Sequence, residues 1–131
     1  MPHFNTIEEV VEDLQNGRMV VVVDERATSG EGDEVIGEGE LMMIAELATA
    51  DAINFMMRHA GSPPTVAARR DHLSKLDIHE VATGSRGPRG ASIMVSINAR
   101  DVEGTGVSAV DRALTIRRLT DAASTPEDFE Q

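Results

Sequence analysis

Residues 19–45 read "MVVVVDERATSGEGDEVIGEGELMMIA", two apolar runs separated by an acidic, glycine-rich stretch. The first run, residues 19–23, is β-branched without polar alternation, which is typical of a strand buried on both faces. The second run, residues 41–45, predicts another buried strand. Between them, residues 24–40 hold seven carboxylates, four glycines and one arginine. This stretch is either a cation- or substrate-binding loop or a solvated turn.

The segments on both sides of these runs predict helices. Thr6 and Glu9 have the spacing of a capping box, apolar residues then recur at helical intervals, and Gly17 provides a stop. After the second run, Thr49 is a candidate N-cap for an amphipathic segment that ends at Gly61. A helix is therefore expected before the first strand and after the second.

The rest of the chain continues the alternation. Residues 67–76 predict a short helix, residues 91–97 a strand, and residues 105–123 a final helix entered between Thr105 and Ser108. Mixed α and β elements without a linker predict an α+β fold in a single domain, residues 1–123. Residues 124–131 are expected to form a polar C-terminal tail.

The composition excludes several classes of protein. Twelve Lys and Arg against 23 Asp and Glu give a net charge of −11, which argues against nucleic-acid binding because phosphate contacts need clustered cations. The chain lacks cysteine, so thiolate chemistry is absent. No window is apolar enough for a membrane span, and the first ten residues lack the features of a signal peptide. A cytoplasmic protein that does not bind membranes is expected.

Four stretches stand out in order along the chain: "VVVVDE", "AELATADAINFMMRHA", "LSKLDIHEV" and, most specifically, "EGTGVSAVDRALTI" at residues 103–116. Together and in this order they resemble the 3,4-dihydroxy-2-butanone-4-phosphate synthase family. This family serves riboflavin biosynthesis and releases formate from ribulose 5-phosphate. The resemblance implies the N-terminal part of that α+β domain, Mg²⁺ as cofactor, and a homodimer with sites at the subunit boundary.

The acidic loop departs from the family pattern. In one register residues 31–33 take the place of the family's Glu-Gly-Asp, and in the other residues 38–40 do. The second register is favoured, because residues 38–49 then match the family without a gap. In either register the metal-ligating glutamate and the arginine beside it are replaced, by residues 28–29 or by residues 35–36 respectively.

The family pattern also continues beyond the last residue of this sequence, with a histidine motif that carries the second metal ligand and phosphate contacts. The resemblance therefore implies a short, diverged member that lacks the C-terminal part of the domain. The ordinary synthase reaction is not expected of this chain alone.

Carboxylates of the acidic stretch are the first candidate site residues. Glycines let the backbone bring carboxylates together around a hard cation, which makes Glu31, Asp33 and Glu38 weak candidate metal ligands. Asp33 or Glu40, the carboxylate retained at the last position of the family's loop, is a candidate catalytic residue. His59 is a further candidate acid or base, or simply a cation that favours the end of its helix.

The "TGVSAVDR" segment is the second candidate site. Ser108 can cap the final helix, with Asp111 three residues on in a capping-box arrangement. Free N–H groups and the helix dipole favour a phosphate or carboxylate there, and Arg112 adds a charged donor. Thr105, Ser108, Asp111 and Arg112 are thus candidate substrate-binding residues; the alternative is a motif that only caps and packs the helix.

These observations favour an altered enzyme that acts on a phosphorylated sugar or related hydroxy-ketone, rather than the standard formate-releasing lyase. One alternative is a non-catalytic binding or partner protein on the same scaffold. Another is the ordinary riboflavin-pathway synthase completed by a second chain. A homodimer with a small-molecule ligand is expected in the favoured case.

Overall fold

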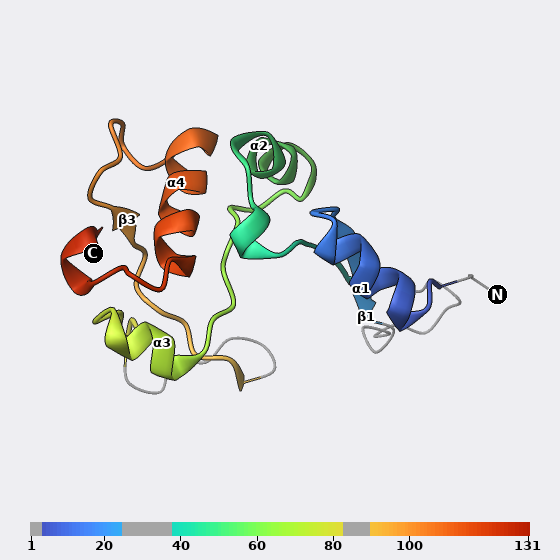
Figure 1. The fold of residues 1–131 in the computed structure, drawn as a ribbon, viewed down its shortest axis with the longest axis horizontal. Helices are drawn as coiled ribbons and strands as arrows, with labels where there is room; N and C mark the ends of the chain where they lie inside the picture. The colour runs from blue at the N-terminus through green and yellow to red at the C-terminus, as the bar shows by residue number, and fades with distance from the viewer. Residues whose placement is uncertain (1–3, 25–37, 83–89) are drawn as a thin grey trace, which may run out of the picture.

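The computed structural model describes residues 4–24, 38–82 and 90–131, excluding the side chains of Asp24 and Glu38 (Figure 1). Figure 1 shows α1 and β1 at one end of the molecule, α3, α4 and β3 towards the other, and α2 between them. The elements in chain order are α1 (Ile7–Gln15), β1 (Val20–Asp24), β2 (Glu38–Met42), the 3₁₀ turn η1 (Ala45–Leu47), α2 (Ala50–His59), α3 (Arg70–Lys75), β3 (Asn98–Ala99), α4 (Ala109–Thr120), the 3₁₀ turn η3 (Pro126–Asp128) and β4 (Phe129–Glu130). The α+β class expected from the sequence is confirmed.

The predicted helix starts are also confirmed. Thr6 Oγ1 accepts the Glu9 N–H at 3.3 Å and Glu9 Oε2 accepts the Thr6 N–H at 2.9 Å, a reciprocal capping box at the start of α1. Thr49 Oγ1 caps α2 by accepting the Ala52 N–H at 3.2 Å. Gly17 has φ +74°, the left-handed conformation of a helix stop.

Two adjacent hydrophobic cores hold the larger part of the fold together, and α4 contributes to both. The first core is built from α2, α4 and the residue that follows η1; its buried members are Ala48, Ile53, Met56, Ala113 and Ile116. The second core joins α3, α4 and β4; its buried members are Leu73, Leu76, Ile78, Leu119 and Phe129. The N-terminal helix α1 contributes no buried residue to either core.

The prediction that residues 19–23 form a strand buried on both faces is wrong. In the part of the chain that the structure describes, β1 pairs only with β2, in an antiparallel two-stranded sheet with Val20 opposite Met42 and Asp24 opposite Glu38. Val21, Val22 and Val23 are 65%, 47% and 43% exposed. Within the described residues the sheet gains no third strand, and both faces of β1 remain accessible.

Three further boundaries differ from prediction. β2 covers Glu38–Met42 rather than residues 41–45, because the chain turns into η1 at Ala45. The helix expected at residues 67–76 is confined to Arg70–Lys75. Residues 91–97 form no continuous strand, and Met94 makes an isolated bridge to Glu80.

Residues 124–131 pack against the domain rather than extending from it as a polar tail. Phe129 is 4% exposed in the second core and pairs with Ala99 in the β3–β4 sheet. Thr125 and Asp128 form a capping box around η3. The Arg100 guanidinium also donates to the carbonyls of Glu127 and Phe129, at 2.7 and 3.1 Å. Burial of the aromatic ring and hydrogen bonds to the neighbouring backbone together fix this segment.

Among the described residues, no helix combines the length and the apolar character that crossing a membrane requires.

Candidate functional site

The turn that leads into α4 is held by the side chain of Asp111. Ser108 Oγ accepts the Asp111 N–H at 3.1 Å, as expected of an N-cap. The predicted reciprocal bond is different: the Asp111 carboxylate accepts the N–H of Gly106, at 3.2 Å, rather than that of Ser108. Because Asp111 is only 8% exposed, its carboxylate braces the turn from inside the protein.

Two glycines in this turn are required by close packing. Gly106 has φ +79°, and a Cβ there would overlap the side-chain amide of Asn98. A Cβ on Gly104 would overlap the Asp111 carboxylate. The backbone of the turn is therefore pressed against β3 on one side and the first turn of α4 on the other.

A buried hydroxyl connects the same helix to β3. The Ala99 N–H donates to Thr115 Oγ1 at 3.0 Å, and the Thr115 hydroxyl donates to the Asp111 carbonyl at 3.0 Å. Neither Asn98 nor Thr115 was predicted from the sequence as part of the site. In the sequence, Asn98 is an asparagine before a glycine-rich turn and Thr115 is a threonine four residues after Asp111. Neither position indicates which group the side chain contacts.

The four predicted substrate-binding residues lie in or beside this one turn. Thr105 and Ser108 are exposed, whereas Asp111 is buried. Arg112 is half-buried, and its Nε donates to the Val107 carbonyl at 2.8 Å. Thr105 and Ser108 are thus placed to meet a ligand from solvent, whereas Asp111 and the Nε of Arg112 hold the backbone that presents them.

The start of α4 has the chemistry of an anion site. The first N–H groups of a helix have no partner within the helix, and the helix dipole places partial positive charge at that end. Of these groups, the Asp111 N–H is used by Ser108. The remaining donors and two exposed hydroxyls suit an oxyanion such as a phosphate.

The predicted acidic site lies mostly outside the described residues. Glu31 and Asp33 belong to residues 25–37, which the structure does not describe, and of Glu38 only the backbone, in β2, is described. Glu40 is exposed on β2, opposite Val22. The carboxylates therefore come from the β1–β2 hairpin and the segment joining its strands, and not from the α4 turn.

The described residues hold no cluster of three potential metal ligands. In residues 4–24, 38–82 and 90–131, no three His, Asp or Glu side chains converge closely enough to hold a metal ion. Magnesium requires near-octahedral oxygen ligands, of which protein carboxylates supply one or two alongside water and substrate. The candidate ligands Glu31 and Asp33 lie outside these residues.

His59 occupies the last position of α2 and is exposed. Its ring centroid lies 4.4 Å from that of Phe55, one helical turn earlier. A second histidine, His72, is half-buried, and its Nε2 lies within hydrogen-bonding distance of the Leu119 carbonyl oxygen, at 2.7 Å. His59 thus remains the more accessible of the two for acid–base chemistry.

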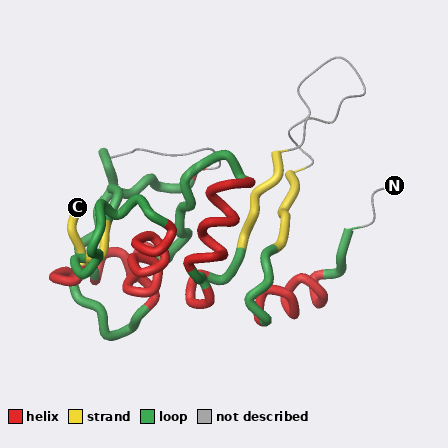
Figure 2. The backbone as a smooth tube through the Cα atoms, turned by 90° about the horizontal axis from the view of Figure 1, so that it is seen from above, coloured by secondary structure: helices red, strands yellow, loops and turns green. Residues whose placement is uncertain are grey.

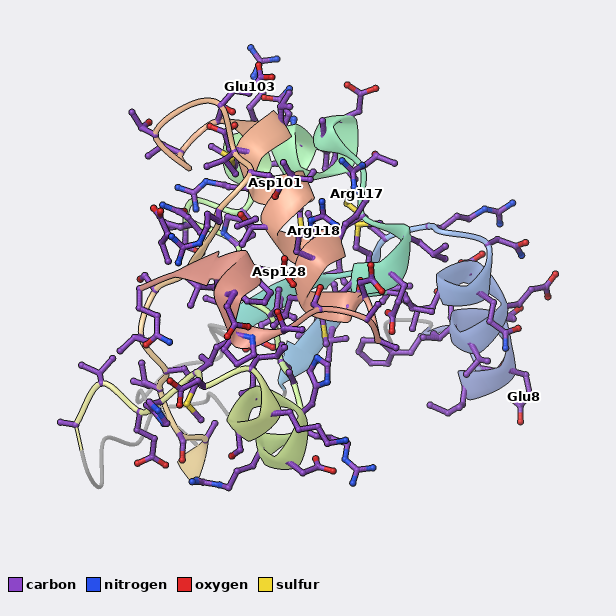
Figure 3. The ribbon with its side chains drawn as sticks, turned by 60° about the vertical axis from the view of Figure 1, so that its left-hand side comes forward. Glu8, Asp101, Glu103, Arg117, Arg118 and Asp128 are labelled. Carbon is purple, nitrogen blue, oxygen red and sulfur yellow. The ribbon has the colours of Figure 1, made fainter. Side chains whose placement is uncertain are left out.

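An ion pair ties α4 to the segment that precedes the turn. The Arg118 Nε lies 3.2 Å from Asp101 Oδ2, and Figure 3 shows both side chains beside α4. The hydrogen bond from the Arg118 guanidinium lowers the pKa of Asp101 below its ordinary value, and the same contact raises the pKa of Arg118. The pair therefore helps to fix residues 100–103 against the helix.

These features define an α+β domain whose last long helix starts at a glycine-rich turn braced by a buried carboxylate. Residues 8–131 match the 3,4-dihydroxy-2-butanone 4-phosphate synthase family, and the chain belongs to that family. The resemblance stated from the sequence is thereby confirmed.

Individual relatives agree along nearly the whole chain. It is 38% identical over 128 residues to the riboflavin biosynthesis protein RibBA of Aquifex aeolicus, covering 96% of this chain and 30% of that protein. It is 34% identical over 131 residues to the 3,4-dihydroxy-2-butanone 4-phosphate synthase of Neisseria meningitidis, covering 100% of this chain and 34% of the relative. The chain thus spans about a third of the length of these curated relatives.

A solved structure supports the same fold. A crystal structure of 3,4-dihydroxy-2-butanone 4-phosphate synthase in complex with two magnesium ions superposes with a TM-score of 0.78 at 32% identity. The match covers 97% of this chain and 56% of that one. The fold described here is therefore shared with a magnesium-binding member of the family.

Proposed function

We propose that this chain acts on a phosphorylated sugar or a related hydroxy-ketone, as an altered enzyme of the 3,4-dihydroxy-2-butanone 4-phosphate synthase family. The observation that carries the proposal is the start of α4, where Asp111 braces a turn that leaves Thr105 and Ser108 exposed beside helix N–H groups. Membership of a family named for a phosphorylated hydroxy-ketone supports the same substrate class.

The proposed roles follow from position. The phosphate of the substrate is held at Thr105 and Ser108, and the guanidinium nitrogens of Arg112 other than Nε add positive charge. Asp33, Glu40 or His59 supplies the acid–base group, because carboxylates and imidazole exchange protons with hydroxy-ketones near neutral pH. Asp111 holds the turn and does not itself contact the substrate.

No role in the reaction is assigned to magnesium, and Mg²⁺ is varied only as a component of the assay. A related synthase structure contains two magnesium ions. In the favoured register the family's ligating glutamate is replaced by Ile36, which lies outside the described residues. Glu31, Asp33 and Glu38 remain the candidate ligands of this chain, and the proposal assigns no step to a bound ion.

Turnover and binding can be measured separately. The purified chain is incubated with ribulose 5-phosphate, with and without Mg²⁺, and with other pentulose and triose phosphates, and products are followed by ³¹P NMR. Asp33→Asn or Glu40→Gln is expected to abolish turnover with the melting temperature nearly unchanged. Glu46→Gln, at an exposed glutamate in η1, serves as the matched control. Full turnover in both site variants would contradict these assignments.

The second candidate function is a non-catalytic binding protein on the same scaffold. The replacement of the family's Arg-Glu pair in the acidic loop favours it. Under this alternative, calorimetry shows phosphate-dependent binding of ribulose 5-phosphate without any product. Formate release would instead favour the ordinary synthase, alone or completed by a second chain.

A homodimer is part of the proposal. Val107 and Val110 flank the start of α4 and are 57% and 64% exposed, which leaves apolar surface next to the candidate site. Light scattering at micromolar concentration is expected to give a dimer that Val110→Lys dissociates. A monomeric wild-type chain would contradict this part of the proposal.

A further inference from the structure

One buried hydroxyl group connects the two elements that meet at the candidate site. Thr115 is 9% exposed and lies on α4 one turn after Asp111, and its hydroxyl donates to the Asp111 carbonyl at 3.0 Å. The same oxygen accepts the backbone N–H of Ala99, in β3, at 3.0 Å. A helical threonine readily makes the first of these bonds, and the lone pairs of its oxygen allow the second. Thr115 therefore joins α4 to β3 through a single atom.

The bond to Ala99 takes the place of a strand partner. Among the described residues β3 pairs only with β4, and Figure 2 shows this pair at the end of the molecule opposite the β1–β2 pair. The Ala99 N–H donates to the helix and not to β4, and Ala99 is 0% exposed, so solvent does not reach it. A buried N–H without an acceptor is costly, so the hydroxyl of Thr115 fixes β3 against α4.

The position of β3 matters because Asn98, the residue before Ala99, lies against the glycine-rich turn. A Cβ on Gly106 would overlap the Asn98 amide, and a Cβ on Gly104 would overlap the Asp111 carboxylate. The same carboxylate accepts the Gly106 N–H at 3.2 Å. The backbone of the turn is thus enclosed between one side chain from β3 and one from α4.

The Asp101–Arg118 ion pair is a second link between α4 and the segment that follows β3. Its side chains are 46% and 40% exposed, and ion pairs in contact with solvent contribute little to holding a geometry. The two bonds of the Thr115 hydroxyl are buried and join the neighbour of Asn98 directly to the backbone of Asp111. The hydroxyl, rather than the ion pair, therefore sets the separation of the two side chains that enclose the turn.

We propose that Thr115 is a positioning residue for the phosphate site at Thr105 and Ser108, an inference that rests on the proposed function. Its hydroxyl keeps Asn98 and Asp111 at the separation that the turn requires, and Thr105 lies between the two glycines of that turn. Without the hydroxyl, β3 shifts away from α4 and the turn loosens. Phosphate binding then weakens, because donors that are not fixed beforehand lose freedom when the ligand arrives.

Substitutions at Thr115 separate the hydroxyl from the shape of the side chain. Thr115→Val removes the hydroxyl at nearly constant shape, Thr115→Ser retains it, and Ile78→Val, in the second core, controls for a general loss of stability. Calorimetry measures the Kd of ribulose 5-phosphate at a temperature where circular dichroism shows that every variant is folded. Thr115→Val is expected to weaken binding about tenfold. The other two variants should bind like the wild type.

Two further measurements support the comparison. Hydrogen exchange at the Gly106 amide, followed without ligand, should become faster in Thr115→Val but not in Ile78→Val. Asn98→Ala removes the other side of the enclosure while leaving the Ala99 bond in place, and it should weaken ribulose 5-phosphate binding to a similar extent. This variant decides the point if Thr115→Val does not fold.

Two results would overturn the inference alone. The first is wild-type affinity in a folded Thr115→Val or in Asn98→Ala. The second is an equal loss of affinity in Thr115→Val and Ile78→Val, since the loss would then follow stability and not the turn. Absence of ribulose 5-phosphate binding by the wild-type chain would instead overturn the proposed function, and this inference with it, so the two failures are distinguishable.

Discussion

The buried carboxylate of Asp111 accepts the backbone N–H of Gly106 at 3.2 Å, across the glycine-rich turn that starts α4. Asp111 also donates its own backbone N–H to Ser108 Oγ, so this one residue fixes both the backbone of the turn and the cap of α4. The turn carries two exposed residues with hydroxyl groups, Thr105 and Ser108.

Asp111→Ala is expected to lower the free energy of unfolding by about 1–3 kcal/mol, because it leaves the Gly106 N–H without its charged acceptor. Urea denaturation measures the loss. Glu103→Gln, at an exposed position before the turn, is the control and should change stability by less than about 0.5 kcal/mol. Equal stability of the two variants would show that the carboxylate does not brace the turn.

Gly106→Ala should be more harmful than Gly61→Ala. Both glycines have positive φ, +79° and +72°, so both variants incur the backbone cost of about 1–2 kcal/mol. Only at Gly106 does the added Cβ overlap another group, the side-chain amide of Asn98, whereas Gly61 has open space. Overpacking adds about 1–3 kcal/mol, and thermal melts of both variants measure the difference. A similar melting temperature for the two would refute the close approach.

Phe129→Ala is expected to lower the free energy of unfolding by about 3–5 kcal/mol, the usual cost of emptying an aromatic site in a core. Phe55→Ala is the comparison, since Phe55 is 48% exposed and its loss should cost at most about 1 kcal/mol. Chemical denaturation of both variants decides the point. If the Phe129 variant were as stable as the Phe55 variant, the C-terminal segment would not be part of the fold.

The Asp101–Arg118 pair predicts a small pH dependence. The pKa of Asp101 is lowered in the folded protein from its ordinary value of 3.8 by the Arg118 hydrogen bond. The pair therefore stabilises the fold above about pH 4, and its contribution is lost as pH falls through the lowered pKa. Melting temperatures of the wild type and Asp101→Asn should differ at pH 7, and this difference should shrink as the pH falls below about 4. A constant difference at both pH values would contradict the assignment.

The sequence by itself determined the local features and the family of this protein. Capping residues could be read directly at Thr6, Thr49 and Ser108, because a cap bonds to backbone groups two or three residues away. The "GTGVSAVDR" segment likewise identified the family and located the candidate turn, since its two glycines and its aspartate lie within a few residues of each other.

Only the tertiary structure decided what each element packs against. The valines of β1 have the pattern of a buried strand but are exposed, because burial depends on which distant segments cover a strand and not on the strand itself. Phe129, in an otherwise polar segment, is buried because the fold brings it against Leu73 of α3 and opposite Ala99 of β3. The direction of the Asp111 carboxylate, toward Gly106 rather than Ser108, was set in the same way by the turn packed between β3 and α4.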